Sequence, residues 1–335
     1  MVSSTAVSRL SRPFCLQREV AKMPIPESKF NNWHGTGADK GSADARDKTR
    51  RALMSERSPL EQADEDYEVY LQGSYANTTH TRGSSDVDVV AKITSAWRSD
   101  LEELSEEEEE RYNDDHDDAD YDHRDFYDDV LTALRIKFGS SAVTPGNKAI
   151  KINKEKTSLL DVDVDAVACG EYRVYRTYPE SGDEDAEIDK GMHFMPQYDN
   201  DRVINFPKIH RENGREMHSN YKETVRIFKN ARYYYNNHFD TLWTIDAHSY
   251  GIECLIYNVP ESILKRTSRS DRFDETLSYL DNADFSTFDQ VSEMESLFGD
   301  SNTQWSTDEA DELITRLREM WDDWYSKRKN AQLFH

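Results

Sequence analysis

Cysteine is scarce in this sequence, and the few cysteines present are widely spaced. The 335 residues contain Cys15, Cys169 and Cys254, which form no Cys-x-x-Cys pair and no grouping with histidine. This spacing excludes the common zinc-binding patterns. The histidines fall at no regular metal-binding spacing, and no Ser/His/Asp grouping supports a hydrolase. The pattern predicts a reduced, cytoplasmic protein without structural zinc.

Long hydrophobic runs are also absent. Hydrophobic residues make up 36% of the chain, and no apolar stretch approaches the roughly 20 residues that a membrane-spanning helix needs. We therefore expect a soluble protein with no membrane partner.

Positive charge is in short supply. The 42 Lys and Arg residues oppose 66 Asp and Glu residues, which gives a net charge of -24 at pH 7. Proteins that hold DNA through a broad basic face need clustered Lys and Arg to release counterions. We therefore predict no DNA partner. A polyanionic ligand would have to be bound locally, most economically through metal ions.

The order of the predicted elements indicates an α+β fold. Residues 1–23 contain three arginines and almost no acid, which is typical of a targeting peptide or a loose tail, and we interpret them as a flexible tail. Residues 42–56 suit a helix with Ser42 as its N-cap. Strand patterns dominate the next part of the chain, and helical patterns follow from Ser219 onward.

The clearest strand covers residues 85–93. Its valines and other apolar residues alternate with Asp86 and Asp88, so one face is buried and the other is charged. A shorter strand is predicted for Tyr67 to Gln72, and Gly73-Ser74 breaks it. Further strands are predicted for three ranges: 148–152, 159–168 and 172–176.

More than half of the residues between Glu102 and Asp129 are acidic. Such a run cannot pack internally and should be solvated. We therefore predict a mobile insert over about residues 102–123, with Glu106 to Asp122 its most mobile part. The end of the run becomes amphipathic, which predicts a helix that ends near Gly139.

The most informative segment joins a Gly-Ser turn to the charged strand. A Gly73-Ser74 turn lets backbone N–H groups approach a phosphate closely, and the serine hydroxyl adds a donor. Asp86 and Asp88 lie about 7 Å apart along one strand face, close enough to bind the same pair of hard cations. A bare Asp-x-Asp is more often the wet face of an edge strand. The turn upstream and the acids on a later strand favour a metal site instead.

These residues resemble a known family. Gly73-Ser74, Thr78 and the sequence Ser85-Asp86-Val87-Asp88 are similar to the active-site signature of the DNA polymerase β-type nucleotidyltransferases. Within that superfamily the resemblance is to the bacterial and archaeal CD-NTases, relatives of cyclic GMP-AMP synthase and the oligoadenylate synthases. It extends from about Ile25 to the C-terminus. Other segments share it: Trp33 and Gly35, residues 146–150, Tyr221-Lys222 through Lys229-Asn230, and residues 249–253.

The resemblance implies a fold, a reaction and partners. The expected fold is a polymerase β-like core of mixed sheet and helices in residues 24–215, with a helical lobe in residues 216–335 that closes a nucleotide cleft. The expected enzyme is a monomer that joins NTPs, ATP with a second purine or pyrimidine NTP, into a cyclic nucleotide. Two Mg²⁺ ions, with Mn²⁺ as an alternative, would assist. The product would activate a downstream effector in antiphage (CBASS) defence.

The third metal ligand comes from a strand with three candidates. Asp161, Asp163 and Asp165 all share one strand face, so periodicity leaves the choice open. The resemblance favours Asp165, because the family places its third acid just before a short apolar stretch, and Asp163 is the second choice. Ala168 stands where many relatives have proline.

Several residues are expected to contact nucleotide. The resemblance assigns phosphate contacts to Gly73, Ser74, Thr78 and Ser85. Lys222, Arg226 and Lys229 recur at helical spacing and could meet triphosphate oxygens or simply form a cationic surface. Lys229 resembles the donor-triphosphate lysine of the oligoadenylate synthases.

The donor base is assigned to a later segment. The family uses the region of Ser249 and Tyr250 for this base, although a core tyrosine is an equal alternative. Glu253 is interpreted as structural.

Two other functions fit the sequence. A nucleotidyltransferase of this kind could make linear oligonucleotides, or could transfer a nucleotide to a protein or small molecule. A catalytically inactive nucleotide sensor is a third reading, which the intact acids oppose.

Overall fold

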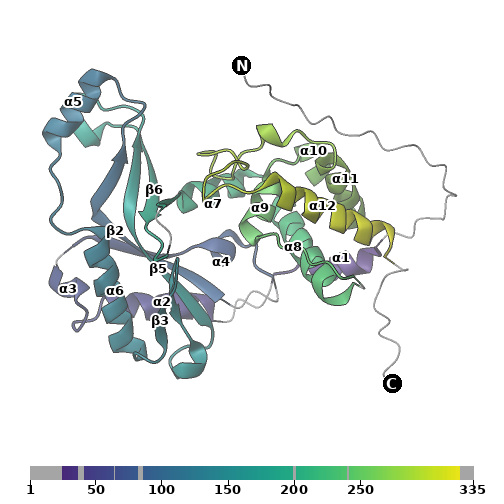
Figure 1. The fold of residues 1–335 in the computed structure, drawn as a ribbon, viewed down its shortest axis with the longest axis horizontal. Coiled ribbons are helices and arrows are strands. Elements are labelled where there is room, and N and C mark those ends of the chain that lie inside the picture. Colours follow the sequence, from purple (N-terminus) through teal and green to yellow (C-terminus); the bar gives the residue numbers. More distant parts are fainter. Residues whose placement is uncertain are drawn as a thin grey trace, which may run out of the picture.

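The computed structural model has two lobes side by side, a sheet lobe and a helical lobe (Figure 1). It describes residues 25–36, 41–63, 65–81, 86–198, 201–239 and 241–324. The tail predicted for residues 1–23 lies outside the described residues. None of the described helices is both long enough and apolar enough to cross a membrane.

The described residues of the sheet lobe form a seven-stranded sheet, and its mixed orientation is as predicted. β2 and β5 are parallel neighbours, and the other pairs are antiparallel. The order is β1-β2-β5-β4-β3, and β6 pairs with β5 and β7. The bounds are β1 Tyr67–Leu71, β2 Asp86–Asp100, β3 Val143–Pro145, β4 Ile150–Ile152, β5 Asp163–Tyr175, β6 Ile188–Phe194 and β7 Val203–Asn205.

Helices cover one face of this sheet. Val87, Val89 and Ala91 are buried in a core cluster that they share with α2 (Ser42–Leu53) and α6 (His123–Phe138). The alternation along β2 is therefore confirmed. The end of α6 at Gly139 is also as predicted. Ser42, in contrast, is the first helical residue of α2, and the N-cap is Gly41 at a φ of 108°, a conformation that glycine adopts readily.

β5 differs from its predicted bounds. It begins at Asp163 and runs unbroken to Tyr175, where two strands were expected. Gly170 lies inside it without interrupting the ladder. A Cβ at this position would lie 2.6 Å from His193 Nε2 on β6, so the glycine makes room for the neighbouring imidazole.

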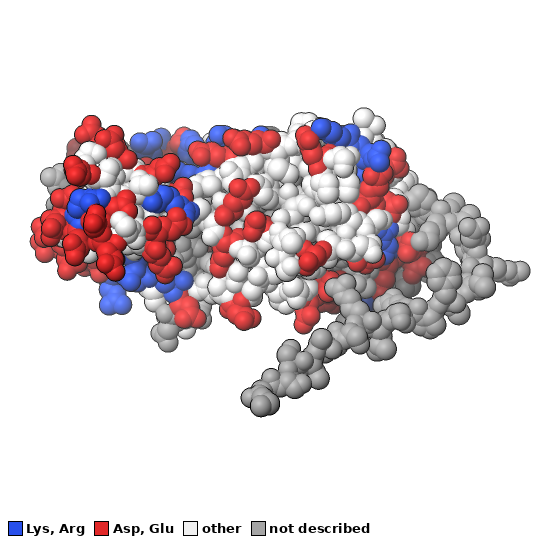
Figure 2. All heavy atoms as spheres, turned by 90° about the horizontal axis from the view of Figure 1, so that it is seen from above, with Lys and Arg blue, Asp and Glu red and all other residues white. Residues whose placement is uncertain are grey.

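The acidic segment that was predicted to be a mobile insert contains a helix. Residues Glu106–Asp115 form helix α5, and Ser105 and Glu108 cap its start reciprocally. Tyr112 is 8% exposed and packs edge-on against Tyr175 and Tyr178. The buried Tyr112 ring, together with hydrogen bonds that Glu108, Arg111 and Asp115 make with Tyr178, therefore anchors a helix whose remaining side chains are mostly solvated acids. α5 lies at the far end of β2 and β5 (Figure 1), the end of the molecule where acids are densest in Figure 2.

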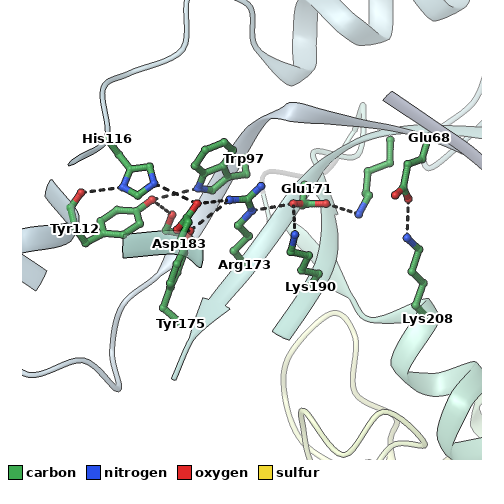
Figure 3. Close-up of polar contacts among 12 residues, drawn as sticks. Glu68, Trp97, Tyr112, His116, Glu171, Arg173, Tyr175, Asp183, Lys190 and Lys208 are labelled. Carbon is green, nitrogen blue, oxygen red and sulfur yellow. Dashed lines mark hydrogen bonds and ion pairs between the residues drawn. The ribbon is translucent and has the colours of Figure 1, made fainter. Parts of the chain in front are cut away.

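A row of charged and polar side chains connects the end of α5 to the centre of the sheet (Figure 3), and Lys92, Glu171 and Arg173 in this row are buried. Glu171 accepts hydrogen bonds from Lys92 Nζ at 2.7 Å and from Arg173 Nε at 2.8 Å. Arg173 also donates to Asp183 at 3.1 Å, and His116 Nε2 lies 3.5 Å from the same carboxylate. Burial alone would raise the pKa of Glu171, but its two cationic partners outweigh burial and lower it.

The helical lobe contains the helices predicted from Ser219 onward. Its core includes a segment that the sequence placed in the other lobe. Phe30 packs against Phe273 with ring centroids 5.3 Å apart, and Trp33 packs against Tyr234 at 5.6 Å. The helices are α1 Glu27–Trp33, α7 Pro207–Glu216, α8 Tyr221–His238, α9 Ser249–Tyr257, α10 Glu261–Leu264, α11 Arg269–Leu280 and α12 Thr307–Asp322. Assigning residues 25–33 to the first lobe was therefore wrong, because their aromatic rings complete the helical core.

Candidate active site

Two carboxylates face each other across the central pair of parallel strands. The register of β2 and β5 places Asp88 opposite Asp165, and Asp86 opposite Asp163. Asp88 and Asp165 both line a cleft of about 640 Å³ between the sheet and the helical lobe. Asp86 is exposed and shares the strand face of Asp88. Two of the three predicted acids thus lie at one cleft, with the third two residues before Asp88.

The negative charge in this cleft is poorly compensated. Burial, together with the negative charges of Asp165 and Asp86, raises the pKa of Asp88 to about 6. Burial likewise raises the pKa of Asp165, although Lys151 opposes the shift from 3.8 Å. Carboxylates that repel one another in this way are the oxygen donors that hard divalent cations bind. The chemistry of the donor set therefore fits a metal site.

The fit rests on donor type and strand register. Within the described ranges no three His, Cys, Asp or Glu side chains are gathered closely enough to hold a metal ion between them. The three aspartates would have to turn toward a common ion.

The structure separates the three candidates for the third acid. Asp163 Oδ1 accepts a hydrogen bond of 2.8 Å from the backbone N–H of Lys154, so this carboxylate is used to hold the preceding loop. Asp161 lies before β5 begins. Asp165 alone of the three lines the cleft.

The Gly-Ser segment lies directly against Asp88. It starts a short helix, α4 (Gly73–Asn77), immediately after β1. Gly73 has a φ of +66°, and a Cβ there would lie 2.3 Å from Asp88 Oδ2. Glycine is required on both counts. The close approach of the backbone at Gly73 is therefore toward the Asp88 carboxylate.

The other residues predicted to contact phosphate differ in exposure and in their hydrogen bonds. Thr78 is exposed at a φ of 60°, and its carbonyl oxygen accepts a hydrogen bond of 2.6 Å from Arg226. Ser74 uses its carbonyl oxygen to accept from the N–H groups of Thr79 and His80. Ser85 lies outside the described residues.

Lys229 is not at the cleft surface. It is 4% exposed, and its Nζ donates to Thr79 Oγ1 at 3.2 Å and to Glu253 Oε2 at 3.3 Å. Protein groups enclose the ammonium in this structure, and the contact of Lys229 with a triphosphate stays a prediction. Lys222, on the same helix, is half-buried. Its pKa is lowered mainly by burial and secondly by the positive charge of Arg215.

Glu253 occupies a central position that the sequence did not reveal. Its carboxylate accepts hydrogen bonds from Thr79 Oγ1 at 2.8 Å and Asn77 Nδ2 at 3.0 Å, and His210 Nε2 lies 2.9 Å away. Burial would raise the pKa of Glu253, but Lys229, His210 and Thr79 outweigh it and hold the pKa at about 2. Glu253 is structural, as predicted. It joins α9 in the helical lobe to the segment that follows α4.

Comparison with known proteins identifies the family. Residues 53–184 match the nucleotidyltransferase domain, and residues 209–322 match the cGAS/DncV-like nucleotidyltransferase C-terminal helical domain. The chain is 35% identical over 308 residues to the cyclic nucleotide synthase CdnE01 of Staphylococcus haemolyticus, covering 90% of this chain and 100% of that protein. The chain belongs to the cGAS/DncV-like nucleotidyltransferases. Enzymes with this domain generally use divalent metal ions, which agrees with the carboxylates in the cleft.

Two further comparisons concern one relative. The chain is 36% identical over 306 residues to the cyclic UMP-AMP synthase of Rhodothermus marinus, covering 90% of this chain and 99% of that protein. The solved structure of the Rhodothermus marinus CdnE c-UMP-AMP synthase with Apcpp and Upnpp has a TM-score of 0.77 to this chain. That comparison has 34% identity and covers 90% of this chain and 98% of that one.

In this nucleotidyltransferase the helical lobe supplies the aromatic wall of the cleft. Tyr250 lines the cleft, stacks on His210 with ring centroids 5.5 Å apart and donates a hydrogen bond of 2.7 Å to Gln290 Oε1. Ser249 instead accepts a hydrogen bond of 3.3 Å from Arg232. Sequence reasoning missed Trp305, which lines the same cleft. Trp305 lies more than 50 residues beyond Tyr250 in a segment without strong periodicity, so the sequence did not indicate that it lies near the cleft.

Proposed function

We propose that this nucleotidyltransferase joins NTPs into a cyclic dinucleotide or larger cyclic oligonucleotide. In each step an NMP is transferred from an NTP to a ribose hydroxyl, and pyrophosphate leaves. The observation that carries the proposal is the placement of Asp88 opposite Asp165 in a cleft between the two lobes. The product would serve as a second messenger that reaches an effector in antiphage defence, in a reaction that draws on cytoplasmic NTPs.

The proposed roles follow from position. Asp86, Asp88 and Asp165 would hold two Mg²⁺ ions, or Mn²⁺ in their place. Bound metal would lower the pKa of the attacking hydroxyl and neutralise charge on the leaving pyrophosphate. Gly73 keeps the backbone close to Asp88, and Tyr250 offers a ring face to a base.

The relatives support cyclisation and suggest substrates. Both relatives described above are named as cyclic nucleotide synthases, and this chain covers nearly their whole length. The Rhodothermus marinus structure contains analogues of ATP and UTP. ATP with UTP is therefore the first pair to test, followed by ATP with each other NTP.

Product analysis tests the proposal. The full chain is incubated with ATP and a second NTP in the presence of Mg²⁺, and the products are identified by mass spectrometry before and after phosphatase treatment. A ring has no terminal phosphate, so phosphatase leaves it unchanged. A phosphatase-sensitive chain, a nucleotide attached to protein, or no product would each contradict cyclic synthesis. Asp165→Asn serves as the inactive control.

A further inference from the structure

His248 caps the start of α9 at the wall of the active-site cleft. Its Nδ1 atom accepts a hydrogen bond of 2.9 Å from the backbone N–H of Gly251, the third residue of the helix. The residue is exposed and lines the cleft. One imidazole therefore belongs both to a helix cap and to the surface that a nucleotide would meet.

The cap fixes where the imidazole carries its proton. A backbone N–H can only donate, so Nδ1 must keep its lone pair free of a proton, and the neutral ring is protonated at Nε2. Desolvation by the cleft walls is the main cause that lowers the pKa of His248, and Glu309 and Asp246 oppose the shift. Arg232 and Lys148 add to it. The ring is therefore neutral at pH 7, with its N–H at Nε2.

Packing against two neighbours holds the direction of this N–H group. The imidazole lies 5.3 Å from the ring of Trp305, which is buried. A Cβ on Gly251 would lie 2.7 Å from Trp305 Cδ2 and 3.0 Å from His248 Cε1, so glycine lets both rings close onto the start of the helix. The two nitrogens of an imidazole point in nearly opposite directions. Nε2–H therefore points away from α9, and the cleft is the open space that this side chain lines.

The fold itself does not use the Nε2–H group. Within the residues that the structure describes, the hydrogen bond at Nδ1 is the one that this side chain makes. Two other histidines near the cleft are held by protein groups: His210 Nε2 lies 2.9 Å from Glu253 Oε1, and His193 Nδ1 lies 2.7 Å from Arg202. Histidine is also outside the set of residues that commonly cap helices, since asparagine or serine supplies the same acceptor. The imidazole thus adds to the cap a donor that faces ligand.

Tyr250 places this donor beside a nucleobase. The rings of His248 and Tyr250 lie 6.4 Å apart and within 18° of parallel. Both residues line the cleft. A base that lies on the Tyr250 ring, as proposed above, would therefore have His248 as the neighbouring aromatic group on the same wall.

We propose that His248 is a specificity-determining residue, whose Nε2–H donates a hydrogen bond to a ring nitrogen or carbonyl oxygen of the bound nucleobase. A neutral donor held in one direction discriminates between bases by the acceptor that each base offers at that edge. The inference rests on the proposed binding of a base at Tyr250. It does not depend on whether the product is a ring or a chain.

A substitution that preserves the cap tests the proposal. Asparagine is a strong N-cap, so His248→Asn keeps an acceptor for the N–H of Gly251 and removes the Nε2–H donor. Apcpp and Upnpp, analogues that cannot release pyrophosphate, are titrated calorimetrically into the full chain with Mg²⁺. Binding is thus measured without turnover. The control is His238→Asn, at an exposed position outside the cleft.

His248→Asn should lose affinity for one of the two analogues by about fivefold, as expected for one hydrogen bond between neutral groups. Affinity for the other analogue and thermal stability should stay close to wild type, and His238→Asn should match wild type throughout. His248→Ala removes cap and donor together, so it should show the same loss of affinity and also a lower thermal stability.

Two results would overturn the proposal alone. Unchanged affinities in folded His248→Asn would show that the imidazole serves only as a cap, and equal losses for both analogues would show that it contacts ribose or phosphate. A wild-type chain that binds neither analogue would overturn the proposed function together with this inference.

Discussion

Thr79 in the sheet lobe donates a hydrogen bond of 2.8 Å to the carboxylate of Glu253 in the helical lobe, across 174 residues of sequence. Lys229 lies beside this pair and contacts both residues. All three residues are at most 4% exposed. The contact fixes the segment after α4, and through it the Gly-Ser turn, against the helical lobe.

Replacing Glu253 should destabilise the protein. Glu253→Gln leaves the Lys229 ammonium buried without its counterion, which costs about 3 kcal/mol of unfolding free energy. Denaturant unfolding measures the loss. Glu56→Gln, a substitution on the exposed surface, is the matched control and should change stability little. Equal stability of Glu253→Gln and wild type would show that the negative charge of Glu253 does not stabilise the fold.

The choice of third acid can be tested by rate. Asp165→Asn should slow synthesis about a thousandfold, which corresponds to roughly 4 kcal/mol of lost transition-state stabilisation. Asp161→Asn should have little effect. Asp163→Asn should lower stability more than rate, because its carboxylate accepts from the N–H of Lys154. Product formation and thermal stability are measured for all three. A fast, folded Asp165→Asn together with an inactive Asp161→Asn would reverse the assignment.

Substitutions at two glycines distinguish the effect of backbone strain from the effect of displacing the Asp88 side chain. Gly73→Ala places a methyl group against Asp88 Oδ2, whereas Gly139→Ala at a φ of +90° meets nothing within 4 Å. Both substitutions should cost about 1 kcal/mol of stability through backbone strain. Only Gly73→Ala should also reduce the synthesis rate, by about a hundredfold if Asp88 is displaced. Similar rates for the two variants would show that Asp88 tolerates the methyl group.

Stability should fall in mildly acidic solution because of His193. Its pKa is lowered to about 3 in the folded state, so the unfolded chain binds the proton first as the pH falls below about 6.5. His193 therefore stabilises the fold above pH 6.5 and loses this contribution progressively between pH 6.5 and 3.

The size of this effect can be measured by substitution. Wild type should lose about 2 kcal/mol from this residue between pH 7 and 5. His193→Gln should have a flatter profile of unfolding free energy against pH in that window, measured in buffers without phosphate. His238→Gln, at an exposed position, should follow wild type. Parallel profiles for all three proteins would rule out this role for His193.

Local sequence patterns predicted the elements that depend on alternation or helical period. β2, α6 and the helices after Ser219 follow directly from such patterns. The choice of the third acid depends on how β5 pairs with β2, and the sequence of one strand does not reveal its pairing register. The burial of Lys229 was not predicted, because helical spacing cannot say which neighbour encloses a side chain. α5 was missed because Tyr112 packs on rings that lie more than 60 residues away along the chain, and a local sequence pattern does not show that contact.

The position of α1 limits how the two lobes can move. The chain leaves the helical lobe after α1, forms the sheet lobe, and returns after β7, so the covalent chain joins the lobes at two places, in addition to side-chain contacts such as that of Thr79 with Glu253. Bodies joined at one point can swivel in any direction, whereas two separate attachments leave rotation about the line between them. Opening of the cleft to admit NTPs should therefore follow one hinge axis, with twisting and sliding suppressed.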